Sequence, residues 1–226
     1  MPRAVLFDLD GTLIDSVDLH AEAWQQAFAH FGKTVPYPDV RSQLGKEGNQ
    51  LLPAFLSEEE RARFGDDLLE YRAGLYQQQY LPSVKAFPGA RDLLARLKQS
   101  RMSIGLASYC KRTELGYYLR LVGGASLVDA ATTAEDVGRS KAPEVFRACL
   151  ERLDVRARDA VAVGDSPVDV EDARRAGITT VGVLSGGFPQ GDLEAAGCVA
   201  VYRDPADLLA RIATSPLAAG RSAQQR

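Results

Sequence analysis

The protein has 226 residues, enough for a full hydrophobic core in one domain or in a core with a small insert. Apolar residues make up 46% and charged residues 25%, and 27 basic against 30 acidic residues leave a net charge of −3. No basic run favours a nucleic-acid partner, and no apolar stretch approaches the roughly 20 residues needed to cross a bilayer. The composition therefore argues against nucleic-acid binding and membrane insertion.

The number and spacing of the cysteines indicate the cellular compartment of the protein. There are three, Cys110, Cys149 and Cys198, and they show no Cys-x-x-Cys spacing, which argues against a disulfide framework or a zinc site. The N-terminus enters an apolar strand almost at once and lacks the flanks of a signal peptide. We therefore expect a cytoplasmic protein, either a monomer or a small homo-oligomer.

The first predicted element is a strand over residues 5–9, within VLFDLDGTLIDS. Its apolar run is interrupted by Asp8 and Asp10, and alternation along a strand places both on the same side. Like charges this close repel, and a strand inside a compact protein has little water to screen them. The closeness of Asp8 and Asp10 in a buried strand therefore requires a chemical explanation.

Residues 16–81 are predicted to form an α-helical cap inserted after the first strand. No convincing strand occurs there, whereas helical patterns cover residues 18–32, 50–56 and 57–80. Ser57 followed by Glu60 is a capping-box signature for the third pattern.

The remaining chain alternates strands with helices, which is typical of an α/β fold with a Rossmann-like parallel sheet. We predict a catalytic core from residues 1–15 and 82–213, and a disordered tail over 214–226. The predicted strands after the first are residues 103–107, 127–131, 160–163, 180–184 and 199–202. The predicted helices are residues 89–99, 143–153, 168–176 and 205–212.

Polar residues follow four of these strands. Besides Asp8 and Asp10, Ser108 follows the strand 103–107, Lys141 precedes the helix at 143, and Asp165 and Asp169 follow the strand 160–163. Alone, each has a bland explanation as a turn, a helix cap or a solvated side chain. Together they fall in order at one sheet edge, where open α/β sheets bind ligands. Clustered carboxylates there predict magnesium, which commonly accompanies phosphate.

These segments resemble, in order, the four motifs of the haloacid dehalogenase superfamily: VLFDLDGTLIDS, LAS, the lysine segment GRSKAPEVF and VGDSPVD. The resemblance extends to about residue 212 and is greatest to the phosphatase and β-phosphoglucomutase-like subgroup with an α-helical cap. It implies a magnesium-dependent phosphomonoester hydrolase acting on a small phosphorylated metabolite. Asp8 would attack phosphorus to form an aspartyl-phosphate, and Asp10 would act as general acid and base.

The resemblance also implies the supporting residues. Phosphoryl oxygens would be held by Ser108 and by the backbone of Gly11 and Thr12. Magnesium would be bound by Asp8, the backbone carbonyl of Asp10, Asp165 and Asp169.

The third motif departs from the family pattern, which is usually Lys-Pro-x-Pro before an acid. GRSKAPEVF is one residue short between Lys141 and Pro143. We expect Lys141 to be the motif lysine, and the shorter loop leaves Arg139 as an alternative cation.

Two residues of the cap are candidate substrate contacts. Lys46 lies in a charged tip between Gly45 and Gly48, and its alternative is a solvated loop lysine. His20 and Trp24 share a helix face, in a pattern similar to the start of the cap in β-phosphoglucomutases. The alternative for His20 is a partly buried ring packed on Trp24.

Other activities of the superfamily fit these residues less well than a phosphatase. The second acid, Asp10, disfavours a dehalogenase or a phosphonatase, and retention of both acids disfavours a non-catalytic binding module. A sugar phosphomutase stays open, although Thr12 and the pair Asn49-Gln50 depart from that subgroup.

Overall fold

A computed structural model describes residues 2–137 and 144–218. It divides the chain into two compact units, of which one is Asp15–Lys85 and the other is formed by the chain on both sides of it. The expected cap, residues 16–81, lies inside the first of these units, called the cap unit below. The other is called the core unit.

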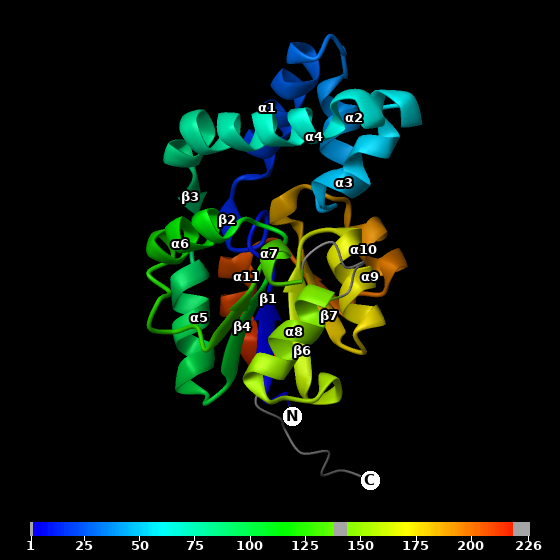
Figure 1. Ribbon diagram of the computed structural model, residues 1–226. Coiled ribbons are helices and arrows are strands. Elements are labelled where there is room, and N and C mark those ends of the chain that lie inside the picture. The colour runs from blue at the N-terminus through cyan, green and yellow to red at the C-terminus, as the bar shows by residue number, and fades with distance from the viewer. Residues whose placement is uncertain (1, 138–143, 219–226) are drawn as a thin grey trace. The chain divides into compact units, whose positions relative to one another are not determined.

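The core unit contains a six-stranded sheet with the order β5-β4-β1-β6-β7-β8 (Figure 1). Every neighbouring pair of strands is parallel, which confirms the predicted α/β, Rossmann-like fold. The strands are β1 (Ala4–Phe7), β4 (Ser103–Ala107), β5 (Ala130–Thr132), β6 (Ala160–Gly164), β7 (Thr179–Val183) and β8 (Ala200–Tyr202). Two further strands, β2 (Ile14–Asp15) and β3 (Lys85–Ala86), form a separate two-stranded sheet where the chain passes between the units.

Burial of the central strand β1 shows that helices cover both faces of the sheet. All four of its residues are fully buried, as expected for a parallel strand between two helical layers. Ala4 and Leu6 join the core cluster that packs on α8 (Glu144–Leu153) and α9 (Pro167–Arg175). Helices α5 (Ala90–Gln99) and α11 (Pro205–Ala210) pack against each other and lie on the opposite face (Figure 1).

Helices of the core unit follow the strands closely. They are α5 (Ala90–Gln99), α6 (Arg112–Leu121), α7 (Ala134–Val137), α8 (Glu144–Leu153), α9 (Pro167–Arg175), α10 (Gln190–Ala196) and α11 (Pro205–Ala210). Of these, α6, α7 and α10 were not predicted. Gly116 interrupts the apolar pattern of α6, which nevertheless begins with a cap in which the Lys111 amide donates to Glu114 Oε2 at 2.8 Å.

The cap unit has its own apolar core. Its helices are α1 (Val17–His30), α2 (Tyr37–Ser42), α3 (Gly48–Leu51) and α4 (Glu58–Leu75), with a π-helical turn over Tyr76–Tyr80. On α1, Val17, Ala21, Trp24 and Phe28 recur at helical spacing and are all buried.

Local sequence signals explain the ends of the cap helices. The capping box that begins α4 is confirmed, because Glu60 N donates to Ser57 Oγ at 3.2 Å and Ser57 N donates to Glu60 Oε2 at 2.9 Å. Helix α2 was not predicted, although it has proline in its first turn, a position that favours a helix start. The expected helix over 50–56 is shorter, and a 3₁₀ turn containing Pro53 follows Leu51.

Among the described residues, no helix is long and apolar enough to cross a membrane. The chain near its C-terminus is more ordered than the expected tail, because Ser215 and Leu217 are 6% and 1% exposed. Residues 219–226 lie outside the described part of the chain.

Candidate active site

The strand order reverses at β1. From β1 the chain builds β4 and β5 on one side of it, and then β6, β7 and β8 on the other. Asp8 follows the last residue of β1, and Asp165 follows Gly164, the last residue of β6. Because β1 and β6 are parallel neighbours, both acids lie at the carboxyl edge, where α/β sheets bind ligands.

The loop after β1 differs from the predicted strand. The strand ends at Phe7, and the amides of Thr12, Leu13 and Ile14 all donate to the carbonyl of Leu9, at 3.2, 2.9 and 2.9 Å. Gly11 has φ of +86°, a conformation that favours glycine. Asp8 and Asp10 therefore do not lie on alternate positions of a strand, because the turn carries Asp10 away from the strand direction.

Three buried carboxylates form the centre of the site. Asp8, Asp165 and Asp169 each offer a carboxylate oxygen, and these oxygens all lie within 4.8 Å of one another. The residues are 8%, 3% and 7% exposed. Within residues 2–137 and 144–218, none of the three forms an ion pair with a lysine or arginine. The carboxylate of Asp10 is not in this group.

Burial raises the pKa of all three carboxyls, and repulsion within the cluster raises the pKa of Asp8 and Asp165 further. Burial is the largest cause for each; for Asp8 the charges of Asp169, Asp165 and Asp10 follow in that order. The pKa of Asp165 is raised by burial and by Asp169, and is partly lowered by Thr12, whose Oγ1 donates to Asp165 Oδ1 at 3.1 Å. Burial raises the pKa of Asp169 to about 6. A cation would relieve this repulsion.

Asp169 is held by the helix cap in front of it. Its Oδ2 accepts hydrogen bonds from Ser166 N at 3.0 Å and from Ser166 Oγ at 2.8 Å, while Asp169 N donates to Ser166 Oγ at 3.2 Å. This reciprocal arrangement fixes the start of α9 and the direction of the carboxylate. The expected helix start in GDSPVD is therefore confirmed, and the same cap holds the Asp169 carboxylate within the cluster.

Ser108 lies directly after β4 and is 2% exposed. Its amide donates to the carbonyl of Thr132 at 3.2 Å, and its Oγ accepts from Cys110 N at 3.3 Å. The next residue, Tyr109, donates its hydroxyl to Asp172 Oδ2 of α9 at 2.9 Å. Sequence reasoning missed this pair, which ties the loop of Ser108 to the helix of Asp169.

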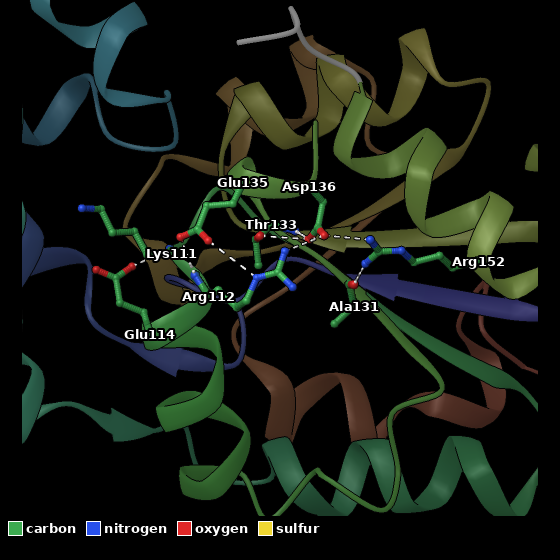
Figure 2. Close-up of polar contacts among 8 residues, drawn as sticks. All are labelled: Lys111, Arg112, Glu114, Ala131, Thr133, Glu135, Asp136 and Arg152. Atoms are coloured by element: carbon green, nitrogen blue, oxygen red, sulfur yellow. Dashed lines mark hydrogen bonds and ion pairs between the residues drawn. The ribbon is translucent and has the colours of Figure 1, made fainter. Parts of the chain in front are cut away.

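Lys141 and Arg139, the candidates for the third motif, lie outside the described residues. Before them, α7 is held by Asp136, whose carboxylate accepts from Thr133 N at 2.8 Å, Arg152 Nη2 at 2.7 Å and Arg112 Nη2 at 2.9 Å. Figure 2 shows this carboxylate between the two arginines. Hydrogen bonds from Arg152 hold the pKa of Asp136 well below the usual range of an aspartate. Asp136 is thus a neutralised structural acid, unlike the three acids of the cluster.

The two candidate residues of the cap lie on different features of that unit. His20 is 8% exposed and stacks on Tyr76 with ring centroids 3.9 Å apart, and its Nδ1 contacts Arg72 Nη2. This stack on Tyr76 was not predicted; the expected alternative was packing on Trp24. Lys46 lies on an exposed loop and contacts Gln43 Oε1.

The glycines flanking Lys46 have different roles. Gly45 adopts φ of +90°. Gly48 begins α3 and lies against Leu69, where an added Cβ would come within 2.6 Å of Leu69 Cδ2. The second glycine of the tip therefore serves close packing.

Sequence reasoning also missed the end of β7. Ser185 Oγ donates to the carbonyl of Gly11 at 2.6 Å, and Gly186 lies directly against the Asp165 carboxylate. The available signal was the run Ser185-Gly186-Gly187 after a buried strand, since glycine there indicates close approach of another group.

Residues 5–183 match the family model described as haloacid dehalogenase-like hydrolase. The chain belongs to this family. The predicted family membership is therefore confirmed. The matched segment contains every candidate residue of the site.

Haloacid dehalogenase-like relatives with assigned names are similar over most of their length. A validoxylamine A 7'-phosphate phosphatase from Streptomyces hygroscopicus subsp. limoneus is 32% identical over 192 residues, covering 82% of this chain and 87% of the relative. A phosphoglycolate phosphatase from Rhodospirillum rubrum is 31% identical over 224 residues, covering 92% and 90%. The crystal structure of a hydrolase from Pseudomonas syringae superposes with a TM-score of 0.83 at 29% identity, covering 93% of this chain and 98% of that one.

Proposed function

We propose that the protein is a magnesium-dependent phosphomonoester hydrolase that acts on a small phosphorylated metabolite through an aspartyl-phosphate at Asp8. The observation that carries the proposal is the cluster of three buried carboxylates, without a described counter-cation, at the topological switch point. The two relatives above are named as phosphatases, in agreement with the prediction from the motifs.

The donor set fits magnesium. Asp8, Asp165 and Asp169 offer hard oxygen ligands. Burial is the largest cause of their raised pKa values, and a bound cation would favour their charged forms. When bound, magnesium would offset the repulsion between the Asp8 carboxylate and the phosphate dianion and would polarise the phosphoryl group.

The remaining chemistry belongs to side chains of this protein. An Asp8 oxygen forms a bond to phosphorus while the bond from phosphorus to the ester oxygen breaks, and Asp10 donates its proton to that leaving oxygen. Water then attacks the phosphoryl group of the aspartyl-phosphate and gives a proton to Asp10. The bond from phosphorus to the Asp8 oxygen breaks, so phosphate is released and the Asp8 carboxylate is restored. Ser108 would hold phosphoryl oxygens in both steps. The amides of Gly11 and Thr12, which were expected to share this role, instead donate to the carbonyls of Ile14 and Leu9 at 2.8 and 3.2 Å.

The raised pKa values predict how magnesium affects stability. The folded protein binds extra protons between the ordinary carboxyl pKa of 3.8 and the raised value, about 6 for Asp169. The metal-free protein therefore loses stability as pH rises through this window. Magnesium at about 100 times its Kd should raise Tm by roughly 5–10 °C near pH 7.5. It should do much less near pH 5, where protons compete. Equal shifts at both pH values, by thermal unfolding, would contradict this assignment.

The third motif gives a second prediction. Lys141→Ala should lower kcat by about 100- to 1,000-fold, because an ammonium beside the phosphoryl group stabilises charge in the transition state. Arg139→Ala, the matched control in the same segment, should cost less than about tenfold. Steady-state kinetics on both variants would decide, and the opposite ranking would assign the cation to Arg139.

Substrate choice is proposed to depend on the cap. Lys46→Ala should lower kcat/KM for the physiological substrate, because this exposed lysine can bind an anionic group on a metabolite. Turnover of a small aryl phosphate, which carries no second anionic group for Lys46 to bind, should hardly change. Equal losses on both substrates would place Lys46 in the chemistry.

A screen of phosphomonoesters tests the function directly. Purified protein with magnesium should release inorganic phosphate from several small phosphorylated metabolites, read alongside the formation of isomerised sugar phosphate. With a hexose 1-phosphate we expect free sugar and phosphate. Faster conversion to the 6-phosphate, dependent on a bisphosphate activator, would identify a phosphomutase instead.

A further inference from the structure

The end of β7 approaches the carboxylate cluster more closely than the motifs indicate. An added Cβ on Gly186 would lie 1.6 Å from Asp165 Oδ2 and 2.3 Å from its Cγ. These distances are far below any real contact, so no larger residue can occupy this position while Asp165 keeps its present conformation. Gly186 itself is buried.

A second glycine faces the same carboxylate. An added Cβ on Gly11 would lie 2.4 Å from Asp165 Oδ2. The Asp165 carboxylate therefore occupies a slot between the backbones of Gly11 and Gly186, and Thr12 Oγ1 donates to its other oxygen at 3.1 Å. The two backbones and this hydrogen bond limit the directions in which the carboxylate can turn.

Ser185 joins the two sides of this slot. Its Oγ donates to the carbonyl of Gly11 at 2.6 Å, linking residues 174 positions apart in the chain. The contact attaches the loop after β7 to the loop that follows Asp8. The spacing between the glycine backbones therefore depends on this hydroxyl.

We propose that Ser185 and Gly186 are positioning residues that hold the Asp165 carboxylate in its metal-binding orientation. The inference rests on the proposed function for its choice of metal. Gly186 leaves the space that Asp165 needs, and Ser185 fixes the width of the slot. Residues that orient a metal ligand typically change metal affinity by about 10- to 100-fold when substituted.

The test is a magnesium titration followed by thermal unfolding. In Gly186→Ala the half-saturating magnesium concentration should rise at least about tenfold, because the methyl group displaces Asp165. Gly191→Ala is the matched control: it adds the same methyl group five residues later, where nothing lies within 4 Å, and it should keep the wild-type value. An unchanged half-saturation in Gly186→Ala would overturn the proposal.

Ser185→Ala carries the test without any steric overlap, should Gly186→Ala fail to fold. It should raise the half-saturating magnesium concentration and lower kcat at limiting magnesium by about tenfold, while Ser185→Thr, which keeps the hydroxyl, restores both. Identical values in wild type and Ser185→Ala would overturn the role of Ser185. A wild-type protein that is stabilised by magnesium but hydrolyses no phosphomonoester would remove the proposed function and leave this inference standing.

Discussion

Asp8→Asn should abolish phosphate release, with a fall in kcat of at least about a thousandfold, because the amide cannot attack phosphorus. No phosphate should be captured covalently when the variant is quenched with acid during turnover. Asp92→Asn, which changes an exposed carboxylate in the first turn of α5, is the matched control and should keep full activity. Retained turnover in a preparation of Asp8→Asn free of contaminating phosphatase would place the nucleophile elsewhere.

The same variant should keep its fold. The pKa of Asp8 is raised by burial and by three neighbouring acids, so replacing this carboxylate by a neutral amide removes repulsion. At a pH above the raised pKa of Asp8, metal-free Asp8→Asn should therefore unfold at a higher temperature than metal-free wild type. A lower Tm would show that the loss of activity reflects damage to the structure.

Removal of divalent metal is expected to have an effect of similar size. With a chelator, phosphate release should fall at least about a hundredfold, because the cluster then carries only negative or protonated carboxylates. Added magnesium should restore it. Calcium should support activity poorly, since its larger and looser shell tends to engage both oxygens of a carboxylate and would misplace Asp8. A chelator saturated beforehand with magnesium is the control. Full activity in free chelator would contradict the assignment of a magnesium site.

The strands and most core helices could be predicted because their signals are local. The five strands predicted after the first, and the helices α5, α8, α9 and α11, agree with the structure to within a few residues. Buried parallel strands require short aliphatic runs, and amphipathic helices require apolar residues at helical spacing. The convergence of Asp8 with Asp165 was also predictable, because topology alone brings the ends of neighbouring parallel strands together.

What could not be predicted depends on the path of the backbone in three dimensions. The turn closed on the Leu9 carbonyl leaves the Asp10 carboxylate outside the cluster, and the alternation rule that placed Asp8 and Asp10 on one side did not predict this turn. The Ser185 bond to Gly11 joins loops far apart in the chain. His20 pairs with Tyr76, a residue of another helix that periodicity within one helix cannot identify.

The position of β1 within the sheet has a consequence for folding during synthesis. Ala4 pairs with Ser103 on one side and with Ala160 on the other, so this apolar strand acquires its second neighbour only after about two thirds of the chain has been made. Contacts between residues far apart along the chain slow folding. Until the second neighbour has been synthesised, the unpaired strand edge favours aggregation. The strand that leads to Asp8 therefore keeps one unpaired edge in the nascent chain until β6 has been made. We expect protection of this edge during synthesis to raise the yield of folded protein.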